Sequence, residues 1–447
     1  MKKISKRAIL ALILGAILLA GVAWFTVQYV LHGSRWATFS GNPHVYTEHG
    51  LPAGEVTDRS GTALLTMGDD RAYAESGEVR RATVHLLGDR NGNIPATVTS
   101  KYINEFVGFG VVNGLYDTEV GGAMQLTVSA PVEKAAWRAL NGRRGLVMVY
   151  NYQTGEILCS VSSPSCDPDN SDETPQDGSY VNRAFQSTYT PGSIFKLVTA
   201  AAALETLPDA AEKTFRCDGS YTIADDVVTC QGVHGDVNLQ EALAVSCNCY
   251  FGQLAQLLGR DALTDAVNRW GVTKPCTFDG ITTAEGHFDV AEASECQLAW
   301  SGIGQHTDLV NPCSYLQFVG SIAGQGKAAV PYLVQSVGKY RAETSTVSTM
   351  EPKTAAVMTE NMAYDVTHVY GTAAFPNVTV CAKSGTAEVG EGLQPHATFT
   401  GFIADEEYPL AFIVVVENGG SGSAVGVPIA GSVLRACVDI LDAEKNN

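Results

Sequence analysis

The sequence predicts an α+β fold with a single N-terminal membrane-spanning helix. Two patterns support this fold class. The chain opens with an uncharged apolar run, and a long segment, residues 144–443, has strand-like stretches at both ends with helical stretches between them. Strands at both ends of one segment favour a mixed antiparallel sheet packed by helices. A segment of this length can bury its own hydrophobic core.

The apolar run from Ala8 to Leu31 contains no charged residue. As a helix it would be about 36 Å long, enough to cross the hydrocarbon core of a bilayer. Four basic side chains precede it within residues 1–7, so the positive-inside rule predicts a cytoplasmic N-terminus and an extracytoplasmic remainder. A cleaved signal peptide is the alternative, although its apolar core is usually shorter.

Residues 36–143 are predicted to form a first, small β-rich domain outside the membrane. The stretch 54–66, GEVTDRSGTALLT, predicts two strands joined by a turn at Asp58–Gly61. The alternating stretches ATVHLL (82–87) and AMQLTV (123–128) predict two further strands.

The segment 144–443 begins with LVMVYNYQTGEILCSVS (146–162), two apolar runs around a polar turn, which predicts an antiparallel hairpin. Helical stretches follow, among them residues 238–246, where Asn238 and Glu241 form the pattern of a capping box. Near the end, residues 377–389, 396–405 and 409–418 predict three consecutive strands, and residues 426–443 predict a closing amphipathic helix.

Composition and cysteine spacing exclude some functions. The net charge is −18, so nucleic acid is not an expected partner. Of 11 cysteines, Cys217 and Cys230 flank a short polar segment and are candidates for a disulfide in an oxidising exterior. Cys247 and Cys249 resemble half a metal site, but no second CxC or CxxC pair completes it, so no metal site is predicted.

Three short motifs occur in order along the segment 144–443. Ser193-Ile194-Phe195-Lys196 is an S-x-x-K at a predicted helix start. Ser246-Cys247-Asn248 is an S-x-N at the end of the predicted 238–246 helix. Lys383-Ser384-Gly385-Thr386 is a K-S-G-T on the first of the three late strands. Each motif alone is a weak signal, whereas all three in this order and context are a strong one.

The first motif carries its own chemical argument. Spacing of i, i+3 places Ser193 and Lys196 on one helix face. Apolar neighbours should desolvate the lysine, and a second cation such as Lys383 should lower its pKa further, so that it can accept the serine proton. The structural alternative makes Ser193 a helix cap and Lys196 a side chain that reaches the surface. The helix start can also supply backbone N–H groups to an oxyanion.

Together the motifs resemble those of the class B (monofunctional) penicillin-binding proteins, the D,D-transpeptidases of peptidoglycan synthesis. The resemblance covers nearly the whole chain. It extends over residues 181–205, 230–259, 302–312, 323–334 and 414–430, and residues 54–66 resemble the stretch found just outside the anchor in these proteins. It implies a serine β-lactamase-like transpeptidase domain at 144–443 and a pedestal-like domain at 36–143.

The resemblance implies a role for each motif residue. Ser193 would be the acylated nucleophile and Lys196 its general base, while Ser246 would relay a proton to the leaving amine. Asn248 would hold the peptide amide, and Lys383 would tune the local field. Further implied roles concern substrate binding: Ser384 and Thr386 would bind the terminal carboxylate, Gly385 would let the substrate backbone approach the strand, and the N–H groups of Ser193 and Thr386 would form the oxyanion hole.

The resemblance also implies partners. These are the D-Ala-D-Ala stem peptide as donor, an amine of a neighbouring strand as acceptor, β-lactams as inhibitors, and a multi-span membrane glycosyltransferase. No metal or organic cofactor is required. A serine β-lactamase, a β-lactam sensor and a catalytically silent scaffold are the alternatives. A bifunctional synthase is disfavoured, because residues 36–143 are too few for a glycosyltransferase domain.

Overall fold

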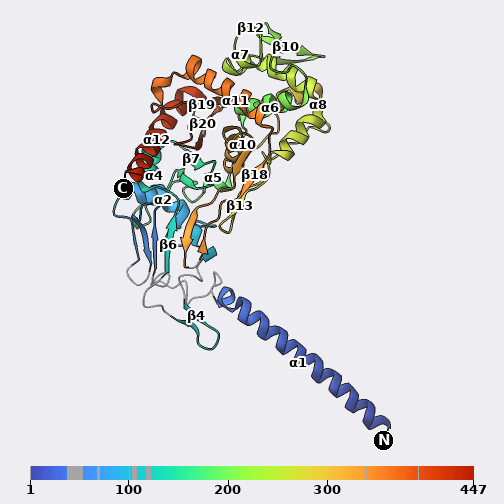
Figure 1. Cartoon of the computed structure of the whole chain (residues 1–447), viewed down its shortest axis with the longest axis vertical. Coiled ribbons are helices and arrows are strands. Elements are labelled where there is room, and N and C mark those ends of the chain that lie inside the picture. The colour runs from blue at the N-terminus through green and yellow to red at the C-terminus, as the bar shows by residue number, and fades with distance from the viewer. Residues whose placement is uncertain are drawn as a thin grey trace.

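The computed structural model describes residues 2–37, 54–67, 71–99, 101–102, 108–116, 122–338, 340–390 and 392–446. Its central element is a five-stranded antiparallel sheet in the order β19–β20–β21–β7–β8 (Figure 1). The strands are β19 (Val380–Ala387), β20 (His396–Ile403), β21 (Leu410–Val416), β7 (Gly145–Asn151) and β8 (Ile157–Ser163). The predicted hairpin and the three predicted late strands are therefore confirmed, and together they build one sheet.

Both faces of this sheet are covered by helices. Along β7, Val147 and Val149 pack toward one face, and Leu146, Met148 and Tyr150 toward the other, as strand geometry requires. The first face packs against α12 (Gly422–Lys445) and α4 (Ala130–Leu140). The second face packs against α10 (Pro312–Ala323). Next to α10 lies α11 (Pro352–Asp365), which contacts α6 (Lys196–Thr206), and α6 in turn contacts α8 (Asn248–Arg269).

One predicted strand is a helix. Residues 82–87 belong to α2 (Gly77–Leu87), which packs against α4 and β8. Val79, Ala82, Thr83 and Leu86 are buried at the three- and four-residue spacing of a helix face. The alternation in ATVHLL was misleading because the last turn of this helix is buried on several sides, so its apolar and polar residues do not report one face.

A second sheet of six strands lies between the five-stranded sheet and α1 (Lys2–Ala37) (Figure 1). Its order is β17 (Tyr340–Arg341), β16 (Val334–Val337), β6 (Gly122–Leu126), β1 (Gly54–Thr57), β2 (Ala63–Met67) and β3 (Ala72–Tyr73). The strands predicted within 54–66 and 123–128 are confirmed as β1, β2 and β6. Because β16 and β17 come from residues 334–341, this sheet joins segments of both predicted domains.

The α1 helix contains the predicted anchor and projects away from the rest of the chain (Figure 1). Within Ser5–Ala37, the most apolar 18-residue window has a mean hydropathy of 2.6 and is 0% buried. The α12 helix also has the length and composition of a membrane span, but 39% of its window is buried and it packs on the sheet. An apolar helix that no other part of the protein covers needs a different apolar environment, and a lipid bilayer provides one.

The remaining described elements are short, and several shape the site. They are η1 (Gly192–Phe195), α5 (Arg183–Gln186), α7 (Leu239–Ala244), α9 (Glu295–Ser301), η2 (Val366–Tyr370), η3 (Thr372–Ala374), and the strand pairs β4 (Gly108–Gly110) with β5 (Gly114–Tyr116), β9 (Phe215–Cys217) with β12 (Gly235–Val237), β10 (Ser220–Ile223) with β11 (Asp226–Thr229), β13 (Thr277–Phe278) with β14 (Ile281–Thr282), and β15 (Lys327–Ala329) with β18 (Thr346–Ser348).

Candidate active site

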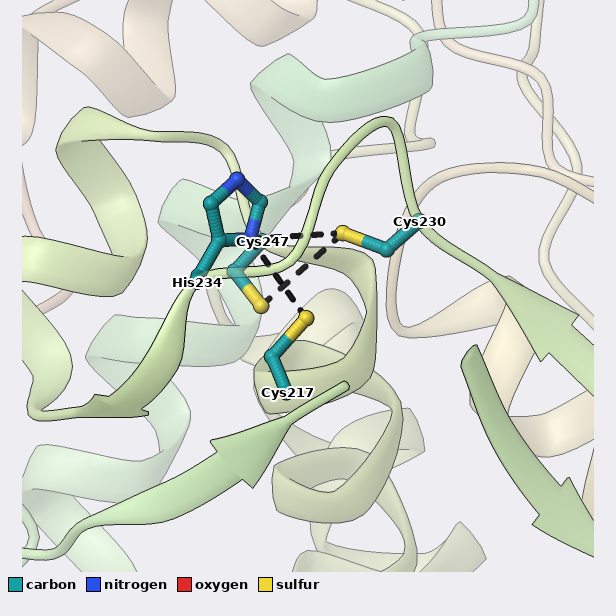
Figure 2. A group of neighbouring side chains, drawn as sticks. All are labelled: Cys217, Cys230, His234 and Cys247. Carbon is teal, nitrogen blue, oxygen red and sulfur yellow. Dashed lines mark hydrogen bonds between the residues drawn. The ribbon is translucent and has the colours of Figure 1, made fainter. Parts of the chain in front are cut away.

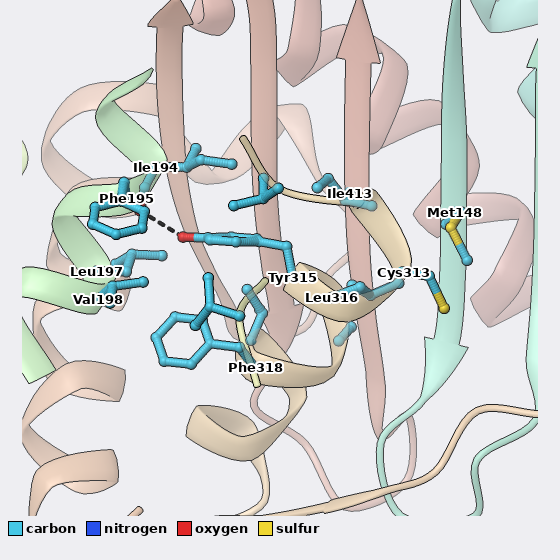
Figure 3. Packing of buried hydrophobic residues seen from close by; sticks show 14 of the residues in the cluster. Met148, Ile194, Phe195, Leu197, Val198, Cys313, Tyr315, Leu316, Phe318 and Ile413 are labelled. Carbon is cyan, nitrogen blue, oxygen red and sulfur yellow. Dashed lines mark hydrogen bonds between the residues drawn. The ribbon is translucent and has the colours of Figure 1, made fainter. Parts of the chain in front are cut away.

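Ser193 lies in a single 3₁₀ turn, η1, which leads directly into α6 at Lys196. Hydrogen bonds with residues from other parts of the chain hold this turn in place. The backbone N–H of Gly192 donates to the carbonyl of Gly304 at 2.8 Å. The hydroxyl of Tyr315 on α10 donates to the carbonyl of Ile194 at 2.6 Å, and its ring lies among apolar side chains of both helices (Figure 3). Ser193 itself is only half-buried, in a turn that these hydrogen bonds fix.

Two glycines let this turn lie against the edge strand β19. Gly192 has a φ of +58°, and a Cβ there would lie 3.0 Å from the carbonyl oxygen of Thr386. A Cβ at Gly385 would lie 2.2 Å from Thr398 Oγ1 and 3.0 Å from the carbonyl oxygen of Pro191. Gly385 was predicted to make room for the substrate backbone. In the structure the space of that missing Cβ is taken by Thr398 and by the chain's own serine-bearing turn, and the approach of a substrate backbone stays a prediction.

Lys196 joins the first motif to the second. Its amine donates to three oxygens, the carbonyl of Ser246 at 2.6 Å, the hydroxyl of Ser246 at 3.1 Å and Oδ1 of Asn248 at 2.8 Å. The side chain is 0% exposed, so the reading in which it reaches the surface is wrong. Among the described residues no hydrogen bond joins this amine to the Ser193 hydroxyl. The proton transfer between them stays a prediction.

The surroundings of Lys196 favour its neutral form. Burial is the main cause, and the positive charge of Lys383 adds to it, so that the pKa of Lys196 is lowered to about 7. The thiols of Cys230, Cys247 and Cys249 act in the opposite direction. Both causes expected from the sequence are thus present, and the amine is close to half neutral at physiological pH.

The S-x-N motif is held in a strained turn between α7 and α8. The α7 helix begins with the predicted capping box of Asn238 and Glu241, and it ends at Ala244. Ser246 has a φ of +53°, which non-glycine residues rarely adopt. Asn248 then begins α8, and its side-chain Nδ2 donates to the carbonyl of Thr229 at 2.9 Å. Strain of this kind is maintained only where the surroundings fix the backbone, and it is frequent at functional sites.

The third motif lies on β19, at the edge of the central sheet. Lys383 is fully buried and donates to the carbonyl of Ser384 at 2.9 Å. Ser384 and Thr386 are half-buried on the opposite side of the pleat. The Thr386 hydroxyl accepts from the backbone N–H of Gly422 at 3.2 Å, at the start of α12. The edge strand thereby places the hydroxyls of Ser384 and Thr386 on its half-buried side, while its lysine stays inside.

Sequence reasoning missed two residues next to this motif. The Tyr370 hydroxyl, at the end of η2, accepts from the backbone N–H of Ser384 at 2.8 Å and lies 3.0 Å from its Oγ. Among the residues that the structure describes, none donates a hydrogen bond to the buried carboxylate of Asp365, and burial raises its pKa to about 7 against the opposing effect of Lys383. Nothing in the sequence around 365–370 marks either residue, because both reach the site through the packing of α11 and η2 on β19.

The structure contradicts the predicted pairing of two cysteines. Cys217 and Cys230 are free thiols, and the Sγ atom of each lies 3.5 Å from Nδ1 of His234. Cys247 completes the group, so that one ligand atom from each of the four residues lies within 4.8 Å of the others (Figure 2). No metal site was predicted from ligand pairs close in sequence, and apart from Cys230 and His234 the residues of this group lie far apart along the chain. The neighbours of Cys247 in this group are Cys217 at the end of β9, Cys230 after β11 and His234 before β12.

Known proteins match this chain over most of its length. A family model for the penicillin binding protein transpeptidase domain matches residues 145–436. The peptidoglycan D,D-transpeptidase PbpA of Mycolicibacterium smegmatis is 32% identical over 362 residues, which cover 71% of this chain and 73% of that protein. MrdA of Escherichia coli, also a peptidoglycan D,D-transpeptidase, is 25% identical over 382 residues, 74% of this chain and 59% of that protein.

A solved structure of penicillin-binding protein A from M. tuberculosis, a ceftriaxone acyl-enzyme complex, superposes with a TM-score of 0.77 at 25% identity. It covers 88% of this chain and 100% of the other. The predicted fold class, with its N-terminal apolar helix and a mixed sheet packed by helices, is confirmed. The chain belongs to the penicillin-binding protein transpeptidase family, and within it to the class B D,D-transpeptidases.

Proposed function

We propose that this chain cross-links peptidoglycan stem peptides through an acyl-enzyme on Ser193. The observation that carries the proposal is the state of Lys196, a fully buried amine with a lowered pKa that is hydrogen-bonded to both polar residues of the S-x-N motif. A buried lysine without a carboxylate partner is costly unless it loses its proton easily. That property is what a general base near pH 7 requires.

In the first step Lys196 takes the proton of Ser193, and Ser193 Oγ attacks the carbonyl carbon between the two terminal D-alanines. The oxyanion that forms would accept from the backbone N–H groups of Ser193 and Thr386. The C–N bond then breaks, and the leaving amine takes a proton from the Ser246 hydroxyl. Lys196 returns its proton to Ser246, which lies 3.1 Å from the amine. A neutral lysine has only two N–H donors, so one of its three contacts must reverse, and the Ser246 hydroxyl is able to donate.

The second step reverses these transfers with a different amine. The amine of a neighbouring stem peptide attacks the Ser193 ester and loses a proton, and the C–O bond breaks as Ser193 regains its proton. The remaining assignments concern binding. Asn248 would hold the peptide amide, Ser384 and Thr386 would bind the terminal carboxylate, and Lys383 would tune the field. The half-buried position of these hydroxyls on the edge strand supports that assignment.

The anchor and the first domain suggest where the chain works. We place the N-terminus in the cytoplasm and the catalytic domain outside, because the basic side chains of α1 are concentrated before its apolar run. Residues 36–143 would be the pedestal domain and 144–443 the transpeptidase domain. Strand polymerisation would be carried out by a multi-span membrane glycosyltransferase that contacts α1 and the first domain, as the family resemblance suggests.

The test is intact-mass measurement of the full chain in detergent after mixing with benzylpenicillin, with Ser193→Ala as the control. A lasting adduct that maps to Ser193 and is absent from the control is the expected result. An adduct that clears within seconds, with drug consumed, would instead show a serine β-lactamase. If no adduct forms, the catalytic proposal is refuted and a scaffold role replaces it.

A further inference from the structure

The β4–β5 hairpin lies against the C-terminal end of the anchor helix α1. Its two strands form a sheet of their own, and they protrude at the end of the molecule from which α1 leaves (Figure 1). The ring of Phe109 on β4 meets the ring of Tyr29 on α1 edge to face, with centroids 6.1 Å apart. A Cβ at Gly33 would lie 2.8 Å from Cζ of Phe109, so this glycine makes room for the ring.

The covered side of α1 marks the same contact. Gly33 is buried, and Tyr29 and Ala37, four residues before and after it, are half-buried, whereas Leu31 is 66% exposed. Residues four apart lie on one helix face. The uncharged run of α1 ends at Leu31, between Tyr29 and Gly33, so the hairpin contacts the helix where its apolar span ends. In a membrane span this level is the boundary between acyl chains and headgroups, where tyrosine and tryptophan are enriched.

The tip of the hairpin is apolar and open. Val111 is 47% exposed and Val112 is 94% exposed. Residues 106–116, FVGFGVVNGLY, contain no charged side chain, although the whole chain has a net charge of −18. Turn residues are usually polar or glycine, so two adjacent exposed valines at a turn beside a membrane span need an explanation.

The hairpin is also weak on its own and narrow. It has three residue pairs, and glycines occupy three of the six paired positions. A single two-stranded hairpin is only marginally stable in water, and glycines weaken it further. A stable protein–protein contact buries about 800 Å² on each partner, which is more than a tip of three residues offers. A lipid surface accepts a narrow apolar tip without that requirement.

We propose that the β4–β5 hairpin inserts Val111 and Val112 into the headgroup region of the membrane leaflet on the side of the catalytic domain. The hairpin would be a second membrane contact beside α1. Within the described part of the chain no strand pairs with the outer edges of β4 and β5. The tip must therefore stay at the interface, where water still reaches the backbone, and not enter the acyl chains.

This contact would restrain the domains outside the membrane. A single helix leaves them free to tilt about its end, and a second contact beside it removes most of that freedom. The six-stranded sheet would share the restraint, because its strand β6 begins at Gly122, shortly after β5 ends at Tyr116. The inference rests on α1 spanning the membrane and on neither step of the proposed reaction.

The experiment measures the depth of the hairpin tip in a bilayer. Full-length Val112→Cys is labelled with a nitrobenzoxadiazole fluorophore and reconstituted into vesicles of phosphatidylethanolamine and phosphatidylglycerol that contain nitroxide lipids. All 11 native cysteines are buried or half-buried, and wild-type chain treated in the same way gives the background. The matched control is Val227→Cys, an exposed valine on the two-stranded β10–β11 hairpin of the catalytic domain.

We expect a nitroxide near the headgroups to quench the label at position 112 by about half and one deep in the acyl chains to quench it less. The label at position 227 should lose less than about a tenth of its fluorescence. Equal behaviour of the two labels would overturn the proposal. Since these vesicles hold no other protein, that result would leave a protein partner as the alternative occupant. Stronger quenching by the deep nitroxide would overturn the interfacial position.

A second pair of variants tests the contact with α1. Gly33→Leu in the labelled chain should push Phe109 away and at least halve the quenching, whereas Gly21→Leu, with nothing within 4 Å of its Cβ, should keep it. Full quenching in Gly33→Leu would overturn the role of this contact. The melting temperature of every variant shows that it is folded. If the wild type is not acylated by benzylpenicillin but its tip is quenched, the proposed function alone is refuted.

Discussion

The lowered pKa of Lys196 makes a quantitative prediction for acylation. If this amine must be neutral to accept the Ser193 proton, the acylation rate at low benzylpenicillin concentration follows its neutral fraction. With a pKa of about 7, that fraction is about one-tenth at pH 6 and about nine-tenths at pH 8. The rate should therefore rise about tenfold over these two pH units and level off above pH 8, while the drug carboxylate stays ionised throughout.

The alternative behaviour is clearly different. A lysine with an ordinary pKa of 10.5 would be about 0.3% neutral at pH 8, so the rate would keep rising about tenfold per pH unit beyond pH 9. The groups that face the amine are Lys383, Cys230, Cys247 and Cys249, with Asp365 behind Lys383. Because Lys383 lowers the pKa of Lys196, Lys383→Gln should move the midpoint to higher pH.

The assay is stopped-flow or quenched mass measurement of the Ser193 adduct from pH 5.5 to pH 9.5 at constant ionic strength. The melting temperature is recorded at each pH, so that unfolding is separated from loss of reactivity. A rate that is flat over this range, or one that never levels off, would refute the assignment of Lys196 as the base. If the rate levels off but the midpoint pH of its rise is unchanged in Lys383→Gln, Lys196 is still the base, but the charge of Lys383 does not lower its pKa.

Three further predictions concern the frame of the site. Gly385→Ala should lower stability by about 1–3 kcal/mol and slow acylation, because its Cβ would lie 2.2 Å from Thr398 Oγ1. Adding Thr398→Ala should restore part of the stability and part of the acylation rate. If neither recovers, the clash lies with another neighbour. Tyr370→Phe should slow acylation roughly two- to tenfold, since it removes one hydrogen-bond partner of Ser384; a lower melting temperature with unchanged acylation would make Tyr370 purely structural. Burial raises the pKa of Glu133 to about 8 from 4.5, so between these pH values the folded state binds a proton that the unfolded state lacks. The free energy of unfolding should therefore fall as the pH rises from about 4.5 to 8. Glu133→Gln should thus gain in melting temperature relative to wild type between pH 5 and pH 8.5, and a constant difference would contradict the raised pKa.

The parts of the fold that the sequence predicts well are those with local causes. The β7–β8 hairpin and the strands β19–β21 are continuous apolar runs bounded by turns, and α7 carries its capping box in its own residues. The stretch 82–87 failed because burial on several sides of α2 removes the polar face by which a helix is recognised. The joining of β16 to β6 depends on a pairing across about 200 residues, for which neither strand carries a local signal.

The candidate site divides in the same way. Ser193 and Lys196 lie three residues apart where η1 leads into α6, so their common helical segment could be predicted from the sequence, whereas the bonds of Lys196 to Ser246 and Asn248 could not. The close approach of the Pro191–Ile194 turn to Gly385 could not be predicted, because only the tertiary structure shows that this turn lies on β19. Tyr370 contacts Ser384 from the end of a π-helical turn, and its role depends on where that turn ends.

The group of Cys217, Cys230, His234 and Cys247 could not be recognised from local sequence motifs. Cys217, Cys230, His234 and Cys247 are spaced unevenly, and zinc motifs are usually recognised by close ligand pairs. Here the two residues closest in sequence are Cys230 and His234. The pairing of β9 with β12 brings Cys217 beside them in space. A search for ligands flanking a short hairpin would have found the group. Cys247 stands between Ser246 and Asn248, which bind Lys196, and Asn248 donates its N–H to Cys230, so this group packs directly against the second motif.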